Sequence, residues 1–326
     1  MKRFAFYIVL LSIASMVVMI PAHAQRHHVR SKESDSDADE SSSNRTKTFT
    51  VGKGGSVVVS TGGGTVHITP WSKEEVSVKV TGLDDDDESN TRITQTGTVI
   101  HISNHADYGE SDAEYDIRVP SQFDVDITTS GGDIHIESGL TGKIYGSTSS
   151  GTITLGNLGG TIDMETSGGD AGIGTIKGDL RLRTSGGEIR VGDVSGDADI
   201  GTSGGNIDIG SVGKSLHATT AGGDVLAGDI GGIADLSTSG GNVTVGKLGD
   251  RTTLSTSGGD IRIAGATGTV SARTAGGGLD LRDIHGSITA KTAGGDIEAE
   301  LIPSGKGRSL LTTASGDVRI YIPANA

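Results

Sequence analysis

An acidic residue recurs directly after a pair of glycines along most of this chain, and rows of carboxylates are the kind of side chains that bind calcium. The acidic residues that follow the motif T-[SA]-G-G or a close variant are Asp133, Asp170, Glu188, Asp224, Asp260, Asp296 and Asp317. The same position also holds uncharged residues, namely Thr152, Asn206, Asn242 and Gly278. Unit charges about 4.8 Å apart repel by about 0.9 kcal/mol even in water, so a row without metal favours such interruptions. We interpret the position as a turn side chain that accepts a backbone hydrogen bond, and keep a calcium-binding repeat protein as an alternative.

The threonine that opens the motif forms a second row, and a flat row of outward threonines would suggest an ice-binding solenoid. Here the threonine has the same parity as the aliphatic residues before it. We therefore expect it to point inward, where its hydroxyl bonds to the backbone or to the next threonine. The neighbouring outward position holds charged residues such as Glu165, Arg183, Arg273 and Lys291, so ice binding is disfavoured.

Catalytic groupings are hard to find among the other polar residues. The histidines beyond the N-terminal stretch are expected at scattered outward or loop positions: His67, His101, His105, His135, His217 and His285. The acidic stretch from Asp84 to Glu88 is typical of a solvated insertion. We expect no catalytic, cofactor-binding or metal-binding residues and no cofactor. A polysaccharide-active β-helix enzyme remains the main alternative.

The elements that must position these rows follow from a repeat of 18 residues. The threonine of the motif recurs at this interval at Thr166, Thr184, Thr202, Thr220, Thr238, Thr256, Thr274 and Thr292. Thr129 and Thr148 precede the series and Thr313 follows it at a longer interval, which gives eleven turns. With threonine as position 1, aliphatic residues occupy positions 6, 8, 11, 15 and 17, so positions 5–8 and 14–18 predict two short strands. The glycines at positions 3 and 4 are expected to form a tight turn at positive φ, and a frequent glycine at position 13, as in Gly160, to form the opposite turn.

A unit of two short strands cannot bury its apolar face alone, so it must stack on its copies. The predicted fold is all-β: a single-domain β-solenoid whose 18-residue coils fill residues 129–326 and extend over roughly 50 Å. Residues 48–128 contain the related phrase "STGGGTVHI" at 60–68 and are expected to form irregular N-terminal coils and a cap. The left-handed helix of hexapeptide-repeat acyltransferases is the alternative fold. It requires an aliphatic residue every six positions, which these coils lack.

The N-terminal residues indicate export. Lys2 and Arg3, the apolar run that follows, and the small residues Ala22 and Ala24 are typical of a secretory signal peptide of residues 1–24. An uncleaved membrane anchor is the alternative. Residues 25–47 have almost no apolar side chains and are expected to form a disordered polar tether. We expect no transmembrane segment after cleavage and a periplasmic or extracellular location.

Composition limits the possible partners. The 326 residues include 54 glycines, 3% aromatic residues and no cysteine, so the core must be thin and aliphatic, and disulfides are excluded. Without Lys2 and Arg3, 25 basic residues face 41 acidic ones, a formal net charge of about −16. Nucleic acids and anionic membrane surfaces are therefore disfavoured as partners, because phosphate binding needs a concentrated basic patch.

The order of three phrases resembles a known family. The phrases "FTVGKGGSVVVSTGGGTVHI" and "YDIRVPSQFDVDITTSGGDIHI", followed by serial "TSGGDI", are similar to the bacterial domain-of-unknown-function family described as "putative adhesins". The resemblance covers nearly all of the chain after residue 47 and implies an exported β-solenoid without established catalytic residues. We expect a non-catalytic adhesin-like or scaffold protein of the bacterial envelope or extracellular space. Its partner would be an unidentified envelope or surface protein or a glycan, bound at outward positions 7, 14, 16 and 18 or at the N-terminal loops.

Overall fold

The computed structural model describes residues 43–52, 54–83, 89–104, 112–302 and 308–324. Of the two units into which the chain divides, Met1–Ser41 lies outside this part, and the strands of the described residues all belong to Ser42–Ala326. The predicted signal peptide, the insertion at 84–88 and His105 also lie outside the described residues. The first strand begins at Ser43, so residues 43–47, which were expected to end the disordered tether, are part of a strand instead.

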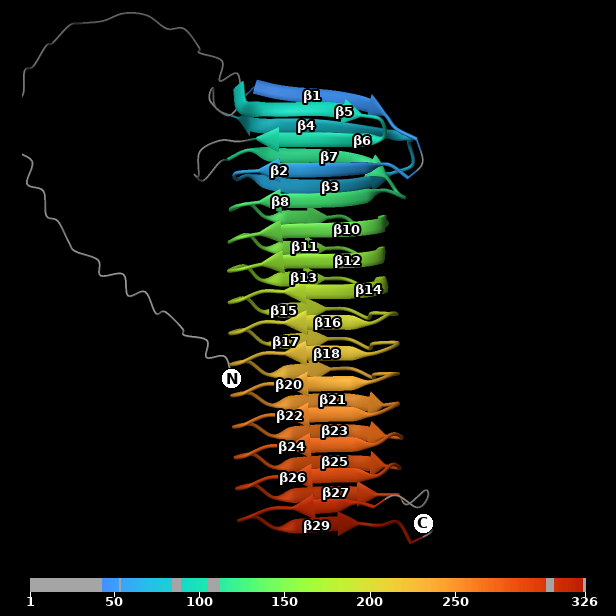
Figure 1. Cartoon of the computed structure of the whole chain (residues 1–326), viewed down its shortest axis with the longest axis vertical. Coiled ribbons are helices and arrows are strands. Elements are labelled where there is room, and N and C mark those ends of the chain that lie inside the picture. The colour runs from blue at the N-terminus through green and yellow to red at the C-terminus, as the bar shows by residue number, and fades with distance from the viewer. Residues whose placement is uncertain (1–42, 53, 84–88, 105–111, 303–307, 325–326) are drawn as a thin grey trace, which may run out of the picture. The chain divides into compact units, whose positions relative to one another are not determined.

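The described strands of unit Ser42–Ala326 form two sheets (Figure 1). The first sheet has 15 described strands, in the spatial order β1 (Ser43–Thr50), β4 (Glu75–Leu83), β7 (Glu114–Pro120), β3 (Thr65–Trp71), β9 (Ile134–Ile136), β11 (Ile153–Leu155), β13 (Ala171–Ile173), β15 (Ile189–Val191), β17 (Ile207–Ile209), β19 (Val225–Ala227), β21 (Val243–Leu248), β23 (Ile261–Ala266), β25 (Leu279–Ile284), β27 (Ile297–Leu301) and β29 (Val318–Tyr321). The second has 14 described strands, in the order β28 (Leu310–Thr312), β26 (Ile288–Lys291), β24 (Val270–Arg273), β22 (Thr252–Ser255), β20 (Ala234–Ser237), β18 (Leu216–Thr219), β16 (Ala198–Gly201), β14 (Ile176–Arg183), β12 (Leu158–Thr166), β10 (Thr141–Thr148), β8 (Asp124–Thr129), β2 (Ser56–Thr61), β6 (Val99–Asn104) and β5 (Thr91–Thr96).

From β8 onward each coil places one strand in each sheet, and from β10 onward each coil stacks in parallel on the coil before it in the sequence. In the first sheet Ile189 pairs with Ile207, and Ile207 pairs with Val225, each 18 residues further along. The longer intervals at the two ends of the series are also present, because Ile134 pairs with Ile153 and Ile297 pairs with Val318. The predicted β-solenoid of 18-residue coils is therefore confirmed.

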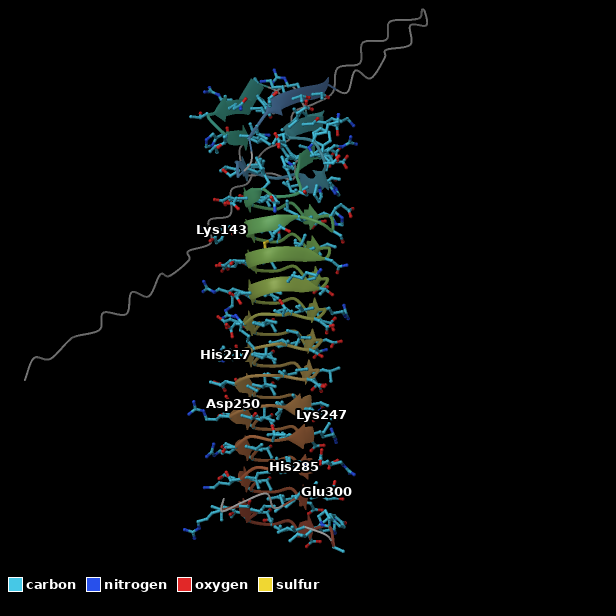
Figure 2. The ribbon with its side chains drawn as sticks, turned by 90° about the vertical axis from the view of Figure 1, so that its right-hand side faces the viewer. Lys143, His217, Lys247, Asp250, His285 and Glu300 are labelled. Carbon is cyan, nitrogen blue, oxygen red and sulfur yellow. The ribbon has the colours of Figure 1, made fainter. Side chains whose placement is uncertain are left out.

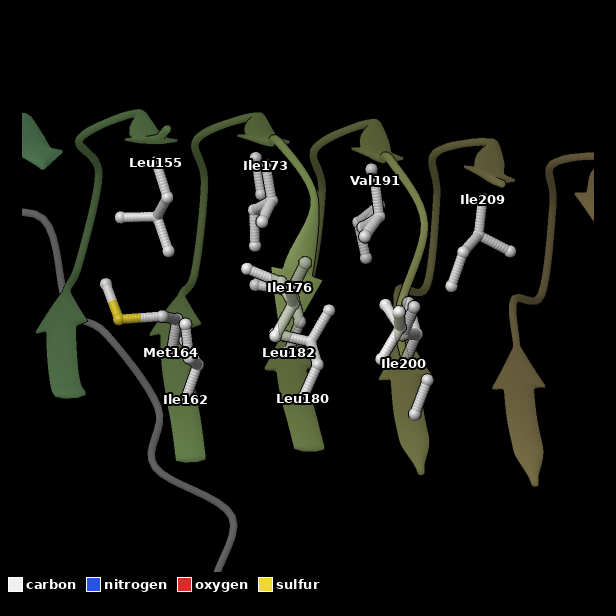
Figure 3. Packing of buried hydrophobic residues seen from close by; sticks show 14 of the residues in the cluster. Leu155, Ile162, Met164, Ile173, Ile176, Leu180, Leu182, Val191, Ile200 and Ile209 are labelled. Carbon is white, nitrogen blue, oxygen red and sulfur yellow. The ribbon is translucent and has the colours of Figure 1, made fainter. Parts of the chain in front are cut away.

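The core is the narrow space between the two sheets. In the coil that starts at Thr184, the five aliphatic positions are Ile189, Val191, Val194, Ala198 and Ile200, and all are buried, with at most 6% of their surface exposed. Position 8 forms a row along the stack, seen as Leu155, Ile173, Val191 and Ile209 in Figure 3. Alternation along each strand thus buries one face and exposes the other, as the period of two requires.

The N-terminal coils do not stack in the order in which they occur in the sequence. The coil made by β2 and β3 pairs on one side with β8 and β9, and on the other side with β6 and β7. The second coil in the chain is therefore placed beyond the first, and the third returns to the opposite side. The antiparallel strands β1, β4 and β5 complete the two sheets at this end.

The two edge strands at the N-terminal end are joined across the end of the stack. Arg45 and Lys47 of β1 donate to the carbonyls of Thr91 and Ile93 of β5 at 3.3 and 3.1 Å. The side chain of Gln95 donates back to the carbonyl of Thr50 at 2.9 Å. Open strand edges are templates for unwanted pairing, and these bonds link the two edge strands at this end.

The paired glycines are required for a reason other than the predicted one. Positive φ occurs at Gly160 (104°), but at none of the described glycines in positions 3 and 4 from Gly131 onward. A Cβ at position 4 would instead overlap the carbonyl oxygen of the same position in the preceding coil, as at Gly187 against Gly169. At position 3, by contrast, a Cβ on Gly186 would have its nearest neighbour at 3.7 Å. The tight approach of stacked turns, and not backbone φ, therefore requires glycine at position 4.

Within the described residues, no helix is both long and apolar enough to cross a membrane.

Candidate functional site

The acidic row at position 5 is a ladder of hydrogen bonds between coils. Oδ1 of Asp170 accepts the backbone N–H of Glu188 at 2.8 Å, and Oδ1 of Asp224 accepts that of Asn242 at 2.6 Å. Asparagine acts in the same way, since Oδ1 of Asn242 accepts the N–H of Asp260 at 2.9 Å. The predicted role as a backbone acceptor is confirmed, and the donor belongs to the next coil.

Some carboxylates of this row also pair with an arginine two residues further along. Asp260 accepts the N–H of Gly278 through Oδ1 at 2.9 Å and the guanidinium of Arg262 through Oδ2 at 2.7 Å. Glu188 and Arg190 form a similar pair at 2.6 Å. Among the described residues, no group of three or more histidine, aspartate or glutamate side chains is placed to hold a metal ion.

The threonine row points inward, as predicted, and bonds to the backbone. Oγ1 of Thr202 donates to the carbonyl of Gly187 in the preceding coil at 3.0 Å and accepts the N–H of Gly205 in its own turn at 3.3 Å. The same two bonds recur at Thr166, Thr184, Thr220, Thr238, Thr256, Thr274 and Thr292. Each hydroxyl is thus inserted into the ladder between two position-4 glycines and satisfies both groups.

At two further positions of the repeat, side-chain oxygens accept a backbone N–H of the next coil, and neither role was predicted from the sequence. At position 10, Oδ1 of Asp193 accepts the N–H of Ser211 at 2.8 Å, and at position 14, Oδ1 of Asp179 accepts the N–H of Asp197 at 2.9 Å. Asp197 in turn accepts the N–H of Ser215 at 3.0 Å. The recurrence of Asn or Asp directly after the glycine of position 9 was the available signal for the first of these ladders.

The structure brings together two histidines that are far apart in the sequence. The rings of His67 and His135 lie 5.3 Å apart on neighbouring strands β3 and β9. Each ring also faces a carboxylate, Glu114 at 3.7 Å and Glu137 at 3.1 Å respectively. Both histidines occupy position 7, but only the unexpected stacking order makes them neighbours. His217 and His285 lie elsewhere and face Asp235 and Asp283.

One phrase of the repeat fits the letters of a nucleophile motif. Residues 201–205 read G-T-S-G-G, which matches G-x-S-x-G formally. In the α/β-hydrolases this motif lies on a sharp turn between a strand and a helix. Here it forms the ordinary repeat turn between β16 and β17, so the match follows from the composition of the repeat.

An open groove of about 620 Å³ lies on the outer face of the second sheet, from β10 to β20. We call it the axial groove, because its two walls are the columns of position-14 and position-16 side chains that follow the stack. The position-14 wall contains Thr161, Asp179, Asp197, Ser215 and Ile233. The position-16 wall contains Tyr145, Asp163, Arg181, Asp199, His217 and Asp235. Figure 2 shows His217 extending from one side of the stack and Lys247 from the other.

Charged side chains of the axial groove are held in a network. Arg181 lies between Asp163 and Asp199, with nitrogen to oxygen distances of 3.5 and 4.0 Å. Arg183 also reaches Asp199, at 2.6 Å, by lying over Gly201 of the next coil. Because its members are fixed by several contacts, the network presents carboxylate and guanidinium groups in set positions.

Charged contacts also fix the side chains of the position-14 wall. Lys214 takes the place of a turn glycine, and its ammonium group lies 3.7 Å from Asp179 and 3.8 Å from Asp197. Both aspartates also accept the backbone N–H bonds described above. These two carboxylates therefore cannot rotate freely, although both remain exposed at the surface.

A smaller hollow lies on the outer face of the first sheet, near the C-terminal coils. Gly278 leaves position 5 without a side chain there, between Asp260 and Asp296. Beside it, the side chain of Arg282 donates to Asp280 at 2.9 and 3.2 Å, and this hydrogen bond raises the pKa of the Arg282 guanidinium above its ordinary value. This hollow is shorter than the axial groove and is lined largely by ion pairs.

Comparison with known protein families gives one match, and it covers the last coils. Residues 232–326 match the family profile described as "Toastrack DUF4097". This part of the chain is similar to the Toastrack family. The resemblance inferred from the repeated phrases is therefore confirmed. No curated protein sequence matches the chain.

Several solved structures resemble this chain at low identity. One from Parabacteroides distasonis, described as a "putative adhesin", has 15% identity and a TM-score of 0.30, with 86% of this chain and 97% of that chain covered. A second "putative adhesin", from Parabacteroides merdae, has 12% identity and a TM-score of 0.28, with 86% and 96% covered. A third, from Bacteroides fragilis, has 13% identity and a TM-score of 0.22, with 85% and 96% covered. At such low identities and TM-scores, the similarity says nothing about what this chain binds.

Proposed function

We propose that this chain is an exported, non-catalytic β-solenoid that presents an adhesin-like binding surface in the bacterial envelope or outside the cell. The axial groove is the observation that carries the proposal. The repeated threonines, glycines and capping residues are used inside the stack, as Thr202 and Gly187 illustrate. The side chains that change from coil to coil are left facing outward, where binding residues are commonly found.

The way in which the groove carboxylates are held supports binding over catalysis. Glycoside hydrolysis commonly uses a pair of carboxyl groups, one of which donates a proton while the other acts as base or nucleophile. In the axial groove, Asp163 and Asp199 are paired with arginine, and Asp179 and Asp197 accept backbone N–H bonds. These contacts suit fixed recognition groups.

The sequence of residues 1–24 supports export, and the acidic composition supports a soluble, self-repelling surface. We therefore place the protein in the periplasm or outside the cell as part of the same proposal.

Sedimentation with isolated envelopes of the source bacterium tests the binding role. The groove variant carries Asp163→Asn, Asp199→Asn and Asp235→Asn, which preserve shape but remove charge. The control variant carries Asp208→Asn, Asp280→Asn and Glu298→Gln on the other sheet. We expect the groove variant to bind about tenfold more weakly than the unmodified protein, and the control to bind about equally, with similar circular dichroism spectra.

Equal sedimentation of all three proteins would contradict a binding role for the groove. Release of soluble products from cell-wall or matrix polysaccharide by the purified protein would contradict the non-catalytic proposal and establish the polysaccharide-active enzyme.

A further inference from the structure

We propose that the axial groove binds an unbranched, uncharged glycan chain that lies parallel to the stack axis. This inference rests on the proposed binding function and names its ligand class. The position-16 wall runs through six neighbouring coils, from Tyr145 on β10 to Asp235 on β20. At about 4.8 Å for each step between coils, this wall extends over roughly 24 Å, enough for several sugar units in a row.

The polar groups of the groove suit hydroxyl groups in particular. Carboxylates accept hydrogen bonds, whereas the guanidinium of Arg181 donates, and the two kinds alternate along the position-16 wall as Asp163, Arg181 and Asp199. A ligand that faces such a wall must accept at one coil and donate at the next. A sugar hydroxyl does both, whereas an ammonium group only donates and an ionised carboxylate only accepts.

The groove also presents its acceptors in a preorganised form. Oδ1 of Asp179 and Oδ1 of Asp197 each accept a backbone N–H, at 2.9 and 3.0 Å, which fixes the direction of both carboxylates. Arg181 and Arg183 fix Asp199 in a similar way. Groups that are ordered before binding lose little conformational entropy on binding, so weakly polar ligands can still be held.

Exposed apolar side chains lie at two points of the groove. Tyr145 is 43% exposed at one end, and Ile233 is 40% exposed near the other. The C–H face of a sugar ring can pack on the phenol ring of Tyr145 while the hydroxyls at its rim reach the carboxylates. Aromatic residues are scarce in this chain, so an exposed tyrosine in the groove is a specific feature.

Two other kinds of linear polymer are disfavoured: an anionic polysaccharide by charge, and an added peptide strand by the lack of an open sheet edge. Five aspartates line it, and Arg181 already lies between two of them, so an anionic polysaccharide would meet net repulsion. An extended peptide that adds a strand requires an open sheet edge. The strands from β12 to β18 instead have hydrogen-bonded neighbours on both sides.

Titration calorimetry with defined oligomers tests the ligand class. The neutral probes are the hexasaccharides of β-1,4-linked glucose and of β-1,4-linked N-acetylglucosamine, backed by an array of other neutral oligosaccharides. Hexagalacturonate and hexalysine are the anionic and cationic probes. We expect at least one neutral probe to bind, with less than about a twofold change in affinity between low and high salt, because screening acts only between charges. Shortening that probe to a disaccharide should weaken binding at least about tenfold.

Substitutions of groove residues test whether the neutral probe binds in the axial groove. We expect Tyr145→Ala and Asp199→Asn each to lower the affinity for the neutral probe about tenfold or more. The control Asp208→Asn, on the other sheet, should change this affinity less than twofold. These positions are exposed or half-buried, so the variants should keep the unfolding temperature of the unmodified protein.

Two results would overturn the glycan assignment. One is the failure of every neutral oligosaccharide on the array to bind. The other is salt-sensitive binding of hexalysine in the groove without binding of neutral sugars. In either case, weaker sedimentation of the groove variant with envelopes would still support the proposed binding function. Equal sedimentation of the groove variant and the unmodified protein would contradict both the binding function and the glycan assignment.

Discussion

At the scale of single residues, the inward threonine solves a problem that stacked turns create. Parallel ladders normally join the N–H of one strand directly to the carbonyl of the next. At the turn, the hydroxyl of Thr202 instead bridges the carbonyl of Gly187 and the N–H of Gly205. The side chain is nearly buried, with 8% of its surface exposed, so these backbone groups have little access to water if the hydroxyl is removed.

Substitution of this threonine tests the bridge. Thr202→Val keeps the shape of the side chain but leaves a buried carbonyl and N–H without a partner, which should cost about 1–3 kcal/mol of unfolding free energy. Thr202→Ser keeps the hydroxyl and should cost less, about 1 kcal/mol for the lost methyl group. Urea unfolding measures both, with Thr253→Val on the exposed face as the control. A valine variant as stable as the original protein would show that the bridge contributes nothing.

Residue types and spacing were enough to predict which side chains face inward. The buried set of Ile189, Val191 and Ile200 follows from alternation alone, and so does the inward direction of Thr184. The groove could not be predicted in the same way. Asp179 and Asp197 look like any outward acidic residues until the stacked backbone shows that each caps the next coil. Side-chain direction at a surface depends on such contacts, which a single coil does not contain.

At the scale of elements, the two glycines of the repeat turn differ in how closely they contact the preceding coil. Gly187 faces the carbonyl of Gly169 so closely that no Cβ fits, whereas a Cβ on Gly186 would meet its nearest neighbour at 3.7 Å, an ordinary van der Waals contact. Turn chemistry alone does not separate the two positions, although serine replaces the position-3 glycine at Ser150 and Ser315 while position 4 is always glycine. The distinction comes from the contact between neighbouring turns, which fixes how closely the coils can stack.

Alanine at each glycine separates these roles. Gly187→Ala should force the neighbouring turns apart and cost about 1–3 kcal/mol, as overpacking does in tight interiors. Gly186→Ala is its matched control and should change the unfolding free energy by no more than about 0.5 kcal/mol, as at other surface sites. Thermal and urea unfolding of the two variants give the comparison. Similar losses from both would mean that turn conformation, and not stacking distance, requires the glycines.

For the folded unit of residues 42–326 as a whole, the stacking order of the first coils is the feature that the sequence did not reveal. Local periodicity identifies each coil but carries no information about which coil it contacts. Val66 pairs with Ile134, 68 residues away, and nothing in the periodicity of either coil specifies this pairing. From β10 onward each coil stacks on the coil before it in the sequence, so there the simple prediction succeeded.

Because each coil contacts mainly its two neighbours, we can predict how unfolding caused by a substitution in the middle of the stack extends to other coils. Ile189 is fully buried on β15, between Ala171 of the preceding coil and Ile207 of the next. Ile189→Asp places a charge in the apolar core, and such a charge costs several kcal/mol unless it is paired. Because each coil is stabilised mainly by its two neighbours, the loss should spread to both sides and divide the stack into parts that unfold separately. Hydrogen exchange should show β13, β15 and β17 losing protection first, while the capped N-terminal coils keep theirs. The control Arg190→Gln, one residue away on the outer face, should leave exchange unchanged. An Ile189→Asp variant that melts at the original temperature would contradict both the inward assignment of this position and the stepwise account of stability.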